Sequence, residues 1–179
     1  MSLPHAILTS LVERPSTGAG LARRFDRSIG HFWQATHQQI YRELGRLEDA
    51  AWVSSEPVED GRGRERLYRV RPAGRRELRR WIAGDVATHA VRDELMVRLR
   101  AEAALGPSGL EARIRHVMAQ EAQRLAHYRD VDAHDFPDGA DTRERRLQRL
   151  VLQAGIRSAA LRLDLYREAL EILTMPASG

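Results

Sequence analysis

The repeat of apolar residues changes its period at Trp52, and this change restricts the folds open to the chain. Up to residue 51 the apolar residues recur at helical spacing, in three segments separated by Pro15 and Gly30. After Trp52 they recur at the spacing of a β-strand, in two short segments on either side of the turn signal Asp60-Gly61. The sequence therefore predicts three helices followed by a two-stranded hairpin.

The three predicted helices each carry one apolar face. They cover residues 3–14, a segment that ends before Gly30, and a run from Phe32 or Trp33 to Ala51. Ser16 or Thr17 is the predicted N-cap of the second helix, because a hydroxyl there can accept a hydrogen bond from a free amide of the first turn.

The predicted hairpin consists of strands 52–58 and 66–70, joined by the basic segment EDGRGRE. Pro72 suits the first turn of a further helix, residues 73–84, because that position needs no backbone N–H. Leu78, Trp81 and Ile82 are predicted to face inward from this helix.

The positive charge of the chain is concentrated in its first part. There is no lysine, and residues 1–85 hold 15 Arg against 11 Asp and Glu, whereas the remainder holds 14 of each. Residues 62–80 alone contain nine Arg and two acidic residues. GC-rich codon usage is the first explanation for the abundance of arginine. An inference about function must therefore depend on where the arginines lie along the chain. A patch this concentrated is expected of a polyanion-binding surface, and a solvated basic face is the alternative.

The pattern and the charge balance both change at residues 84–90, which predicts a domain boundary. We expect one domain over residues 1–84 and an α-helical domain over residues 90–175. Predicted helices of the second domain cover 91–105, 108–132 and 142–174, with a loop at 136–141.

The last predicted helix has apolar residues on two sides. One stripe comprises Leu147, Val151, Ala154, Leu161, Leu165 and Ile172; the other comprises Leu152, Ile156, Ala159, Leu163, Tyr166 and Leu170. Such a helix needs two surfaces to bury against. We expect one stripe to pack on helix 108–132 and one on a second subunit; the alternative is a helix wholly buried in a monomeric bundle. The residues assigned to dimerisation are Leu95, Leu99, Leu152, Ile156, Leu163, Tyr166 and Leu170.

The order helix, helix, helix, two-stranded wing is that of a winged helix-turn-helix. Its third helix can enter a major groove about 12 Å wide, while the wing contacts flanking phosphates or the minor groove. The candidate DNA-binding residues of this helix are Gln34, Thr36, His37, Gln38, Tyr41 and Arg42, and those of the wing are Arg62, Gly63, Arg64 and Arg66. Amides can read base edges, and Arg and Tyr can hold phosphates. The alternative interpretation of the helix is an ordinary polar face.

The chain resembles the PadR-like transcriptional regulators in three stretches: AILTSLVERPSTG, QQIYRELGRLEDAAWV and EDGRGRERLYRVRPAGRREL. These stretches fall within residues 5–82, and the helical remainder is similar in pattern to the longer C-terminal dimerisation domain of one subgroup. Three departures occur. Gly18-Ala19-Gly20 stands where the family usually has Gly-Tyr, Asp49-Ala50-Ala51 replaces an acidic-Gly turn, and Arg71-Pro72 replaces a common Thr.

The resemblance implies a fold that is mainly α with a small two-stranded β wing, made of an N-terminal winged helix-turn-helix and a C-terminal helical dimerisation domain. It also implies a homodimer that binds double-stranded DNA, usually as a repressor, and that in some members is released by a small-molecule effector. The alternative function is a winged-helix interaction module that docks an acidic protein.

Enzymatic and membrane functions are not expected. The chain has no cysteine, no serine in a nucleophile elbow, and a Gly18-Ala19-Gly20 segment whose third glycine position is Arg23. His116 and His127 would lie about 16 Å apart on a helix, too far to share a metal ion. We therefore expect no catalytic residues, no metal and no cofactor. The uncharged opening stretch, Met1 to Val12, is too short to span a bilayer and lacks signal-peptide features, so a cytoplasmic location without membrane contact is expected.

Overall fold

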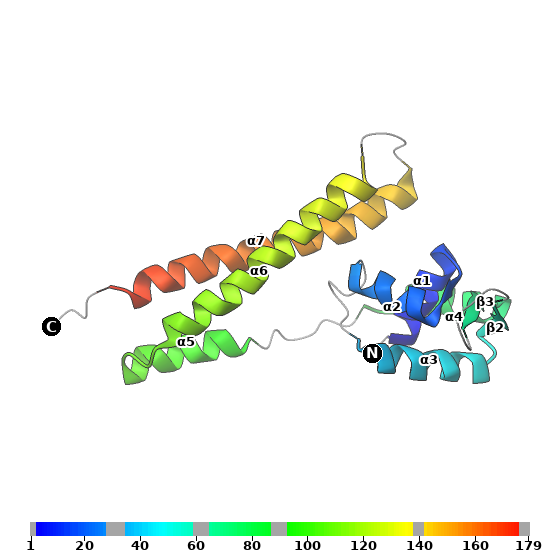
Figure 1. Cartoon of the computed structure of the whole chain (residues 1–179), viewed down its shortest axis with the longest axis horizontal. Coiled ribbons are helices and arrows are strands. Elements are labelled where there is room, and N and C mark those ends of the chain that lie inside the picture. Colours follow the sequence, from blue (N-terminus) through cyan, green and yellow to red (C-terminus); the bar gives the residue numbers. More distant parts are fainter. Residues whose placement is uncertain (1–2, 28–34, 59–64, 87–92, 138–141, 176–179) are drawn as a thin grey trace. The chain divides into compact units, whose positions relative to one another are not determined.

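The computed structural model describes residues 3–27, 35–58, 65–86, 93–137 and 142–175 (Figure 1). The chain divides into two compact units, Met1–Ala87 and Thr88–Gly179. The described residues of the first unit form four helices and a small sheet, and those of the second form three helices. The fold is thus mainly helical, as predicted.

The helices of the first unit enclose one apolar core. They are α1 (Leu3–Glu13), α2 (Gly18–Arg27), α3 (His37–Asp49) and α4 (Pro72–Ile82). The buried residues of this core are Ile7, Leu8, Leu11, Leu21, Ala22, Phe25, Ile40, Leu44, Leu47, Val53 and Leu78. Each buried Leu, Ile or Phe side chain contributes about 1.5–3 kcal/mol relative to an exposed one. The helical spacing of these residues explains why α1 to α3 form and why their polar faces point outward.

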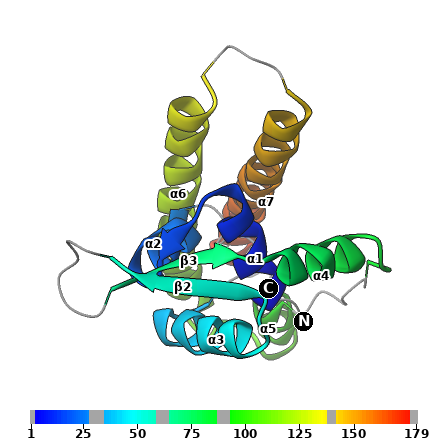
Figure 2. The same ribbon diagram turned by 90° about the vertical axis from the view of Figure 1, so that its right-hand side faces the viewer.

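The sheet has three antiparallel strands in the order β1-β3-β2. The hairpin strands β2 (Val53–Pro57) and β3 (Arg66–Val70) pair from Val53 opposite Val70 to Pro57 opposite Arg66. The third strand is β1 (Ser16–Thr17), which pairs with β3 and was not predicted. A strand of two residues is too short to show a period of two, which explains the omission. Figure 2 shows β2 and β3 side by side, with α3 beside β2.

The predicted N-cap at Thr17 is confirmed, whereas the predicted start of α3 is wrong. Thr17 Oγ1 accepts a hydrogen bond from the Gly20 amide at 3.1 Å. Helix α3 begins at His37 and not near Phe32, because Thr36 is its N-cap in an extended conformation. The Thr36 hydroxyl accepts from the Gln39 amide and the Gln39 side chain accepts from the Thr36 amide, a complete capping box.

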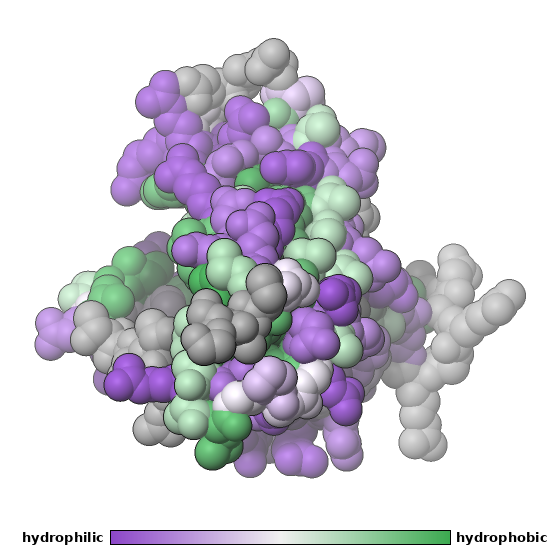
Figure 3. All heavy atoms as spheres, turned by 90° about the vertical axis from the view of Figure 1, so that its left-hand side faces the viewer, coloured by the Kyte–Doolittle hydropathy of each residue, from purple (hydrophilic) through white to green (hydrophobic). Residues whose placement is uncertain are grey.

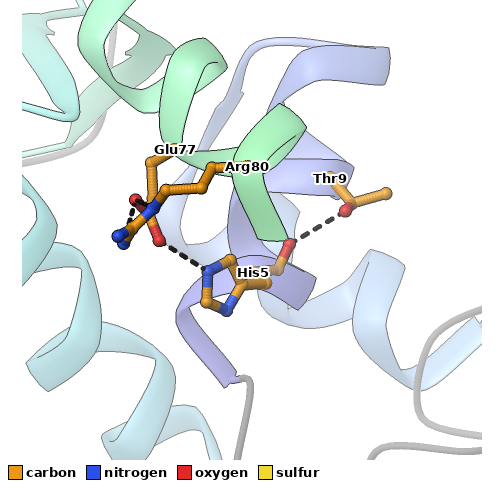
Figure 4. Close-up of polar contacts among 4 residues, drawn as sticks. All are labelled: His5, Thr9, Glu77 and Arg80. Atoms are coloured by element: carbon orange, nitrogen blue, oxygen red, sulfur yellow. Dashed lines mark hydrogen bonds and ion pairs between the residues drawn. The ribbon is translucent and has the colours of Figure 1, made fainter. Parts of the chain in front are cut away.

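Helix α4 contacts α1 through polar groups at one end (Figure 4). His5 Nε2 lies 3.2 Å from Glu77 Oε1, and Arg80 forms an ion pair with the same glutamate. Leu78 is buried as predicted, but Trp81 and Ile82 are 46% and 66% exposed, contrary to the prediction that they face inward. They lie in the last turn of α4, beyond the core that the first unit encloses.

The second unit contains α5 (Glu94–Leu105), α6 (Leu110–Asp135) and α7 (Arg143–Leu173). Helices α6 and α7 lie side by side and antiparallel along most of their length (Figure 1). Three apolar clusters hold them together, centred on Ile114, Leu125 and Tyr128 of α6. Between the helices Asp132 accepts two hydrogen bonds from Arg149, at 2.9 and 3.1 Å, and this contact lowers the pKa of Asp132.

The stripe of α7 that we assigned to dimerisation packs inside the chain. Its residues contact α6 and, near the C-terminal end, α5: Leu152, Ile156, Leu163, Tyr166 and Leu170. Leu95 and Leu99 of α5 join the same packing. These residues thus contribute to the packing of the chain itself, and their part in dimerisation stays a prediction. The two stripes have similar composition, and only the position of α6 decides which of them is covered.

Candidate nucleic-acid interface

The outward face of α3 is polar and accessible. Thr36, His37, Gln38 and Arg42 are exposed, and Tyr41 is 49% exposed. The buried residues Ile40, Leu44 and Leu47 hold the opposite face against the core, so the helix presents its polar side as a ridge. Gln34 lies outside the described residues.

The capping box reduces the number of side chains free to contact a ligand. The Thr36 hydroxyl accepts from the Gln39 amide at 3.2 Å, and Gln39 Oε1 accepts from the Thr36 amide at 2.8 Å. Both side chains fix the start of α3, so His37, Gln38 and Arg42 are the exposed candidates without a capping role. The signal for the box was present in the sequence as Thr followed three residues later by Gln.

Tyr41 lies on the first residue of α2. A Cβ atom at Gly18 would come within 2.3 Å of Tyr41 Cε1 and 3.0 Å of Cδ1 and Cζ. Because no real Cβ tolerates so short a contact, only glycine leaves room for this ring in its present position. This contact links the start of α2 to the exposed face of α3.

Arg66 is the one predicted wing residue within the described part of the chain, since Arg62, Gly63 and Arg64 lie outside it. Its Nε donates to Ser55 Oγ at 2.6 Å and its Nη2 donates to the Ser55 carbonyl at 3.1 Å. Ser55 in turn donates from its amide and its hydroxyl to Glu48 Oε1, at 3.0 and 2.6 Å. Arg66 therefore belongs to a hydrogen-bonded network that joins α3, β2 and β3. We call these three residues, Glu48, Ser55 and Arg66, the wing-base network.

Sequence reasoning missed Glu48 and Ser55. They are seven residues apart and on different elements, so no periodic pattern connects them. The network also affects its surroundings: burial raises the pKa of Tyr68, and the negative charge of Glu48 raises it further. Tyr68 pairs with Ser55 across the hairpin.

The strand β3 and the helix α4 that follows it are rich in exposed arginine. The exposed arginines of β3, α4 and their junction are Arg66, Arg69, Arg71, Arg75, Arg76, Arg79 and Arg80. Arg69 pairs with Glu56 on the surface at 3.0 Å, and the exposed Arg80 pairs with the half-buried Glu77 at 2.6 Å. Surface ion pairs of this kind contribute little to stability, so the guanidinium groups remain available to a stronger anionic partner.

Among the described residues no group of three or more His, Cys, Asp or Glu side chains could hold a metal ion. No described helix is both long enough and apolar enough to cross a bilayer.

The fold and the polar ridge define a winged helix-turn-helix protein, and comparison with known proteins agrees. Residues 7–80 match the model of the transcriptional regulator PadR-like family, and residues 91–174 match that of the virulence activator alpha C-terminal region. The probable transcriptional regulator Rv1176c of Mycobacterium tuberculosis is 39% identical, over 97% of this chain and 98% of its own. The chain therefore belongs to the PadR-like family of transcriptional regulators.

Solved structures share the whole architecture. The virulence activator AphA of Vibrio cholerae is 31% identical with a TM-score of 0.78, covering 96% of this chain and 98% of its own. PadR of Bacillus subtilis, solved in complex with operator DNA, has the same TM-score of 0.78 at 20% identity and covers 97% of this chain and 99% of its own. The latter likeness concerns the fold.

Proposed function

We propose that the chain is a homodimeric repressor that binds a pseudo-palindromic operator on double-stranded DNA. Residues 1–84 would form the DNA-binding domain and residues 90–175 the dimerisation domain. In each protomer α3 would enter the major groove, and the arginines of the wing would contact flanking phosphates. Half-sites would lie about one helical turn apart, as expected for a two-fold dimer of this fold.

The observation that carries the proposal is the polar ridge of α3 beside a surface rich in arginine. His37, Gln38 and Arg42 can donate to base edges or phosphates, whereas the arginines supply affinity that does not depend on sequence. A surface built to dock an acidic protein would expose apolar side chains on this helix. Tyr41 is the single large hydrophobic residue exposed on α3 among its described residues, which favours DNA over the protein-docking alternative.

The dimer is supported by the second apolar stripe of α7. Its large members are between 41% and 62% exposed: Leu147, Val151, Leu161, Leu165 and Ile172. A row of this length along a helix of 31 residues is more than isolated surface apolar residues account for. Figure 3 shows hydrophobic side chains reaching the surface between hydrophilic ones. We assign this stripe, in place of the one first predicted, to the contact between subunits.

Release by a small molecule is the third part of the proposal. Bacillus subtilis PadR has also been solved in complex with p-coumaric acid, with a TM-score of 0.73 and 20% identity. The shared fold supports an effector for this chain as well, without indicating its chemistry. A change in operator affinity on addition of small aromatic acids would test this part.

The experiment that tests the central proposal is DNA binding by the purified full-length protein. The probe is the DNA upstream of its own gene, used for footprinting and for anisotropy at several salt concentrations. We expect protection of two half-sites. If about six phosphates are neutralised, we expect affinity to fall about a thousandfold between about 50 and 200 mM salt. Binding that does not respond to salt, or no protected site, would show that the proposed function is wrong.

A further inference from the structure

We infer that Glu48 is a positioning residue for DNA binding: its side-chain oxygen accepts hydrogen bonds that fix the base of the wing against the end of α3, so removing this acceptor weakens DNA binding. The inference rests on the proposed function. The expected effect of Glu48→Ala on DNA affinity is opposite to that of charge alone, because loss of an acidic residue from a DNA-binding surface should tighten binding to phosphates.

The carboxylate of Glu48 accepts a hydrogen bond on the side of β2 where a neighbouring strand would otherwise pair. β2 is at an edge of the sheet, since the strand order is β1-β3-β2, so within the described part of the chain one side of β2 has no strand partner. The amide of Ser55 donates to Glu48 Oε1 at 3.0 Å. An edge amide that is half-buried must find an acceptor, and a charged acceptor forms a strong bond. Glu48 therefore holds β2 at a fixed distance from the last turn of α3.

The same carboxylate oxygen also helps to position Arg66, the first residue of β3. Ser55 Oγ donates to Glu48 Oε1 at 2.6 Å and accepts from Arg66 Nε at 2.6 Å, and Arg66 Nη2 lies 3.9 Å from Glu48 Oε1. Arg66 pairs with Pro57 in the last residue pair of the two strands, and one further hydrogen bond, from the Val58 amide to the Glu65 carbonyl at 3.1 Å, follows before residues 59–64. The network thus sets the position from which the loop and its arginines leave the sheet.

Loss of the network has two opposite effects on DNA binding. Removing the charge of Glu48 reduces repulsion of phosphates, which tightens binding slightly. Releasing Ser55 and Arg66 lets the hairpin move relative to α3, so the wing and the helix no longer meet the DNA together in a fixed geometry. Fixed geometry governs affinity where two elements must engage at once. The second effect is expected to be larger.

The hairpin offers a matched control in Glu56. It lies next to Ser55 on β2 and pairs with Arg69 at 3.0 Å, and both side chains are more than half exposed. Among the described residues no backbone amide is found to donate to the Glu56 carboxylate, which accepts from Arg69 Nε. Replacing Glu56 removes an equal charge from the adjoining strand β2 without releasing the edge of the sheet, and so measures the electrostatic effect alone.

The test compares four variants of the full-length protein with the wild type: Glu48→Ala, Glu48→Gln, Ser55→Ala and Glu56→Ala. Affinity for one operator fragment and its salt slope are measured well below each thermal unfolding midpoint. Glutamine keeps an oxygen acceptor for the Ser55 amide and hydroxyl but removes the charge. We expect about tenfold weaker binding and a shallower salt slope for Glu48→Ala. Glu48→Gln and Glu56→Ala should bind as tightly as the wild type or more tightly.

Several outcomes would overturn the inference. If the folded Glu48→Ala variant binds as tightly as Glu48→Gln, Glu48 acts only through its charge or only in stability. If Glu48→Ala does not fold, Ser55→Ala decides: unchanged affinity and salt slope in this variant would contradict the network. If the wild type fails to bind DNA, the proposed function fails. Hydrogen exchange of the Ser55 amide still tests the geometry in that case, since it should accelerate in Glu48→Ala and stay slow in Glu48→Gln.

Discussion

The imidazole of His5 lies flat on the indole of Trp81, with ring centroids 4.6 Å apart and planes inclined by 12°. The contact joins the start of α1 to the end of α4, and the His5–Glu77 hydrogen bond lies beside it. Trp81 is nearly half exposed, so the stack closes the edge of the core and not its centre. The charge of Glu77 contributes to this contact between α1 and α4, because its carboxylate binds both His5 and Arg80.

Acid should weaken the contact between α1 and α4, because it protonates the Glu77 carboxylate. The hydrogen bond from His5 lowers the pKa of Glu77, the contacts with Arg80 lower it further, and burial acts in the opposite direction. A carboxylate whose folded pKa is lowered adds stability above its unfolded pKa, and this stability is lost as the pH falls through the folded pKa. Glu77→Gln should therefore lower the thermal midpoint at pH 7 and flatten its fall below about pH 5.

The matched control for Glu77 is Glu94→Gln. Glu94 pairs with Arg98 on the surface of α5, with 77% of its side chain exposed. Thermal unfolding of both variants between neutral and acid pH makes the comparison. An unchanged acid dependence in Glu77→Gln would show that the His5 contact does not contribute to folding.

Replacement by alanine should be favourable at Gly45, which lies in α3, and unfavourable at Gly18, which Tyr41 of α3 contacts. Gly45 is an exposed helical residue with no atom within 4 Å of an added Cβ, so Gly45→Ala should stabilise the protein by about 0.5–1 kcal/mol. Gly18→Ala must displace the ring of Tyr41 and should weaken DNA binding. Urea unfolding and operator titration measure the two effects. Wild-type affinity in Gly18→Ala would exclude a role for the Tyr41 position.

Arg24 should be important for the end of α1. Its Nη1 donates to the carbonyls of Ser10 and Arg14, at 2.6 and 3.0 Å, and burial lowers its pKa. Arg24→Ala leaves these carbonyls without that donor and should cost about 1–3 kcal/mol in the free energy of unfolding. Arg23→Ala, the exposed neighbour on α2, serves as the control for urea unfolding. Equal stability of the two variants would contradict the capping role.

A charge on the exposed stripe of α7 should separate the subunits. Leu161 is 62% exposed, and Leu161→Glu should shift the protein to a monomer in sedimentation and remove the concentration dependence of its thermal midpoint. Asp164→Lys also changes the charge of α7, at an exposed position that lies on neither apolar stripe, and should leave the dimer intact. A Leu161→Glu protein that stays dimeric would place the interface elsewhere.

Local patterns predicted most of the elements, and tertiary contacts explain the differences. Helical spacing located α1, α4 and the two long helices, and the Asp60-Gly61 signal located the hairpin. β1 was not predicted, because a strand of two residues is too short to show an alternation of apolar and polar side chains. The start of α3 was misplaced because the Thr36–Gln39 cap, and not the apolar repeat, determines it. The choice between the two stripes of α7 required the position of α6, which the sequence of α7 does not contain.

The candidate site was predicted in outline only. The exposed positions of α3 followed from its periodicity, since the buried face was evident from Ile40, Leu44 and Leu47. Arg66 was predicted as a phosphate contact, whereas the structure engages it with Ser55 and Glu48. A network that spans three elements depends on the distance between them, and no spacing along the chain encodes that distance.

The central place of β3 in the sheet has a consequence for how chains of this architecture diverge. β3 is paired on one side with β2 and on the other with Ser16 and Thr17, directly before α2. Insertions or deletions between β2 and β3 can therefore change the reach of the wing while the registers that anchor α2 and α3 stay the same. Relatives could acquire new flanking contacts with DNA by altering loop length, without having to evolve a new placement of the helices.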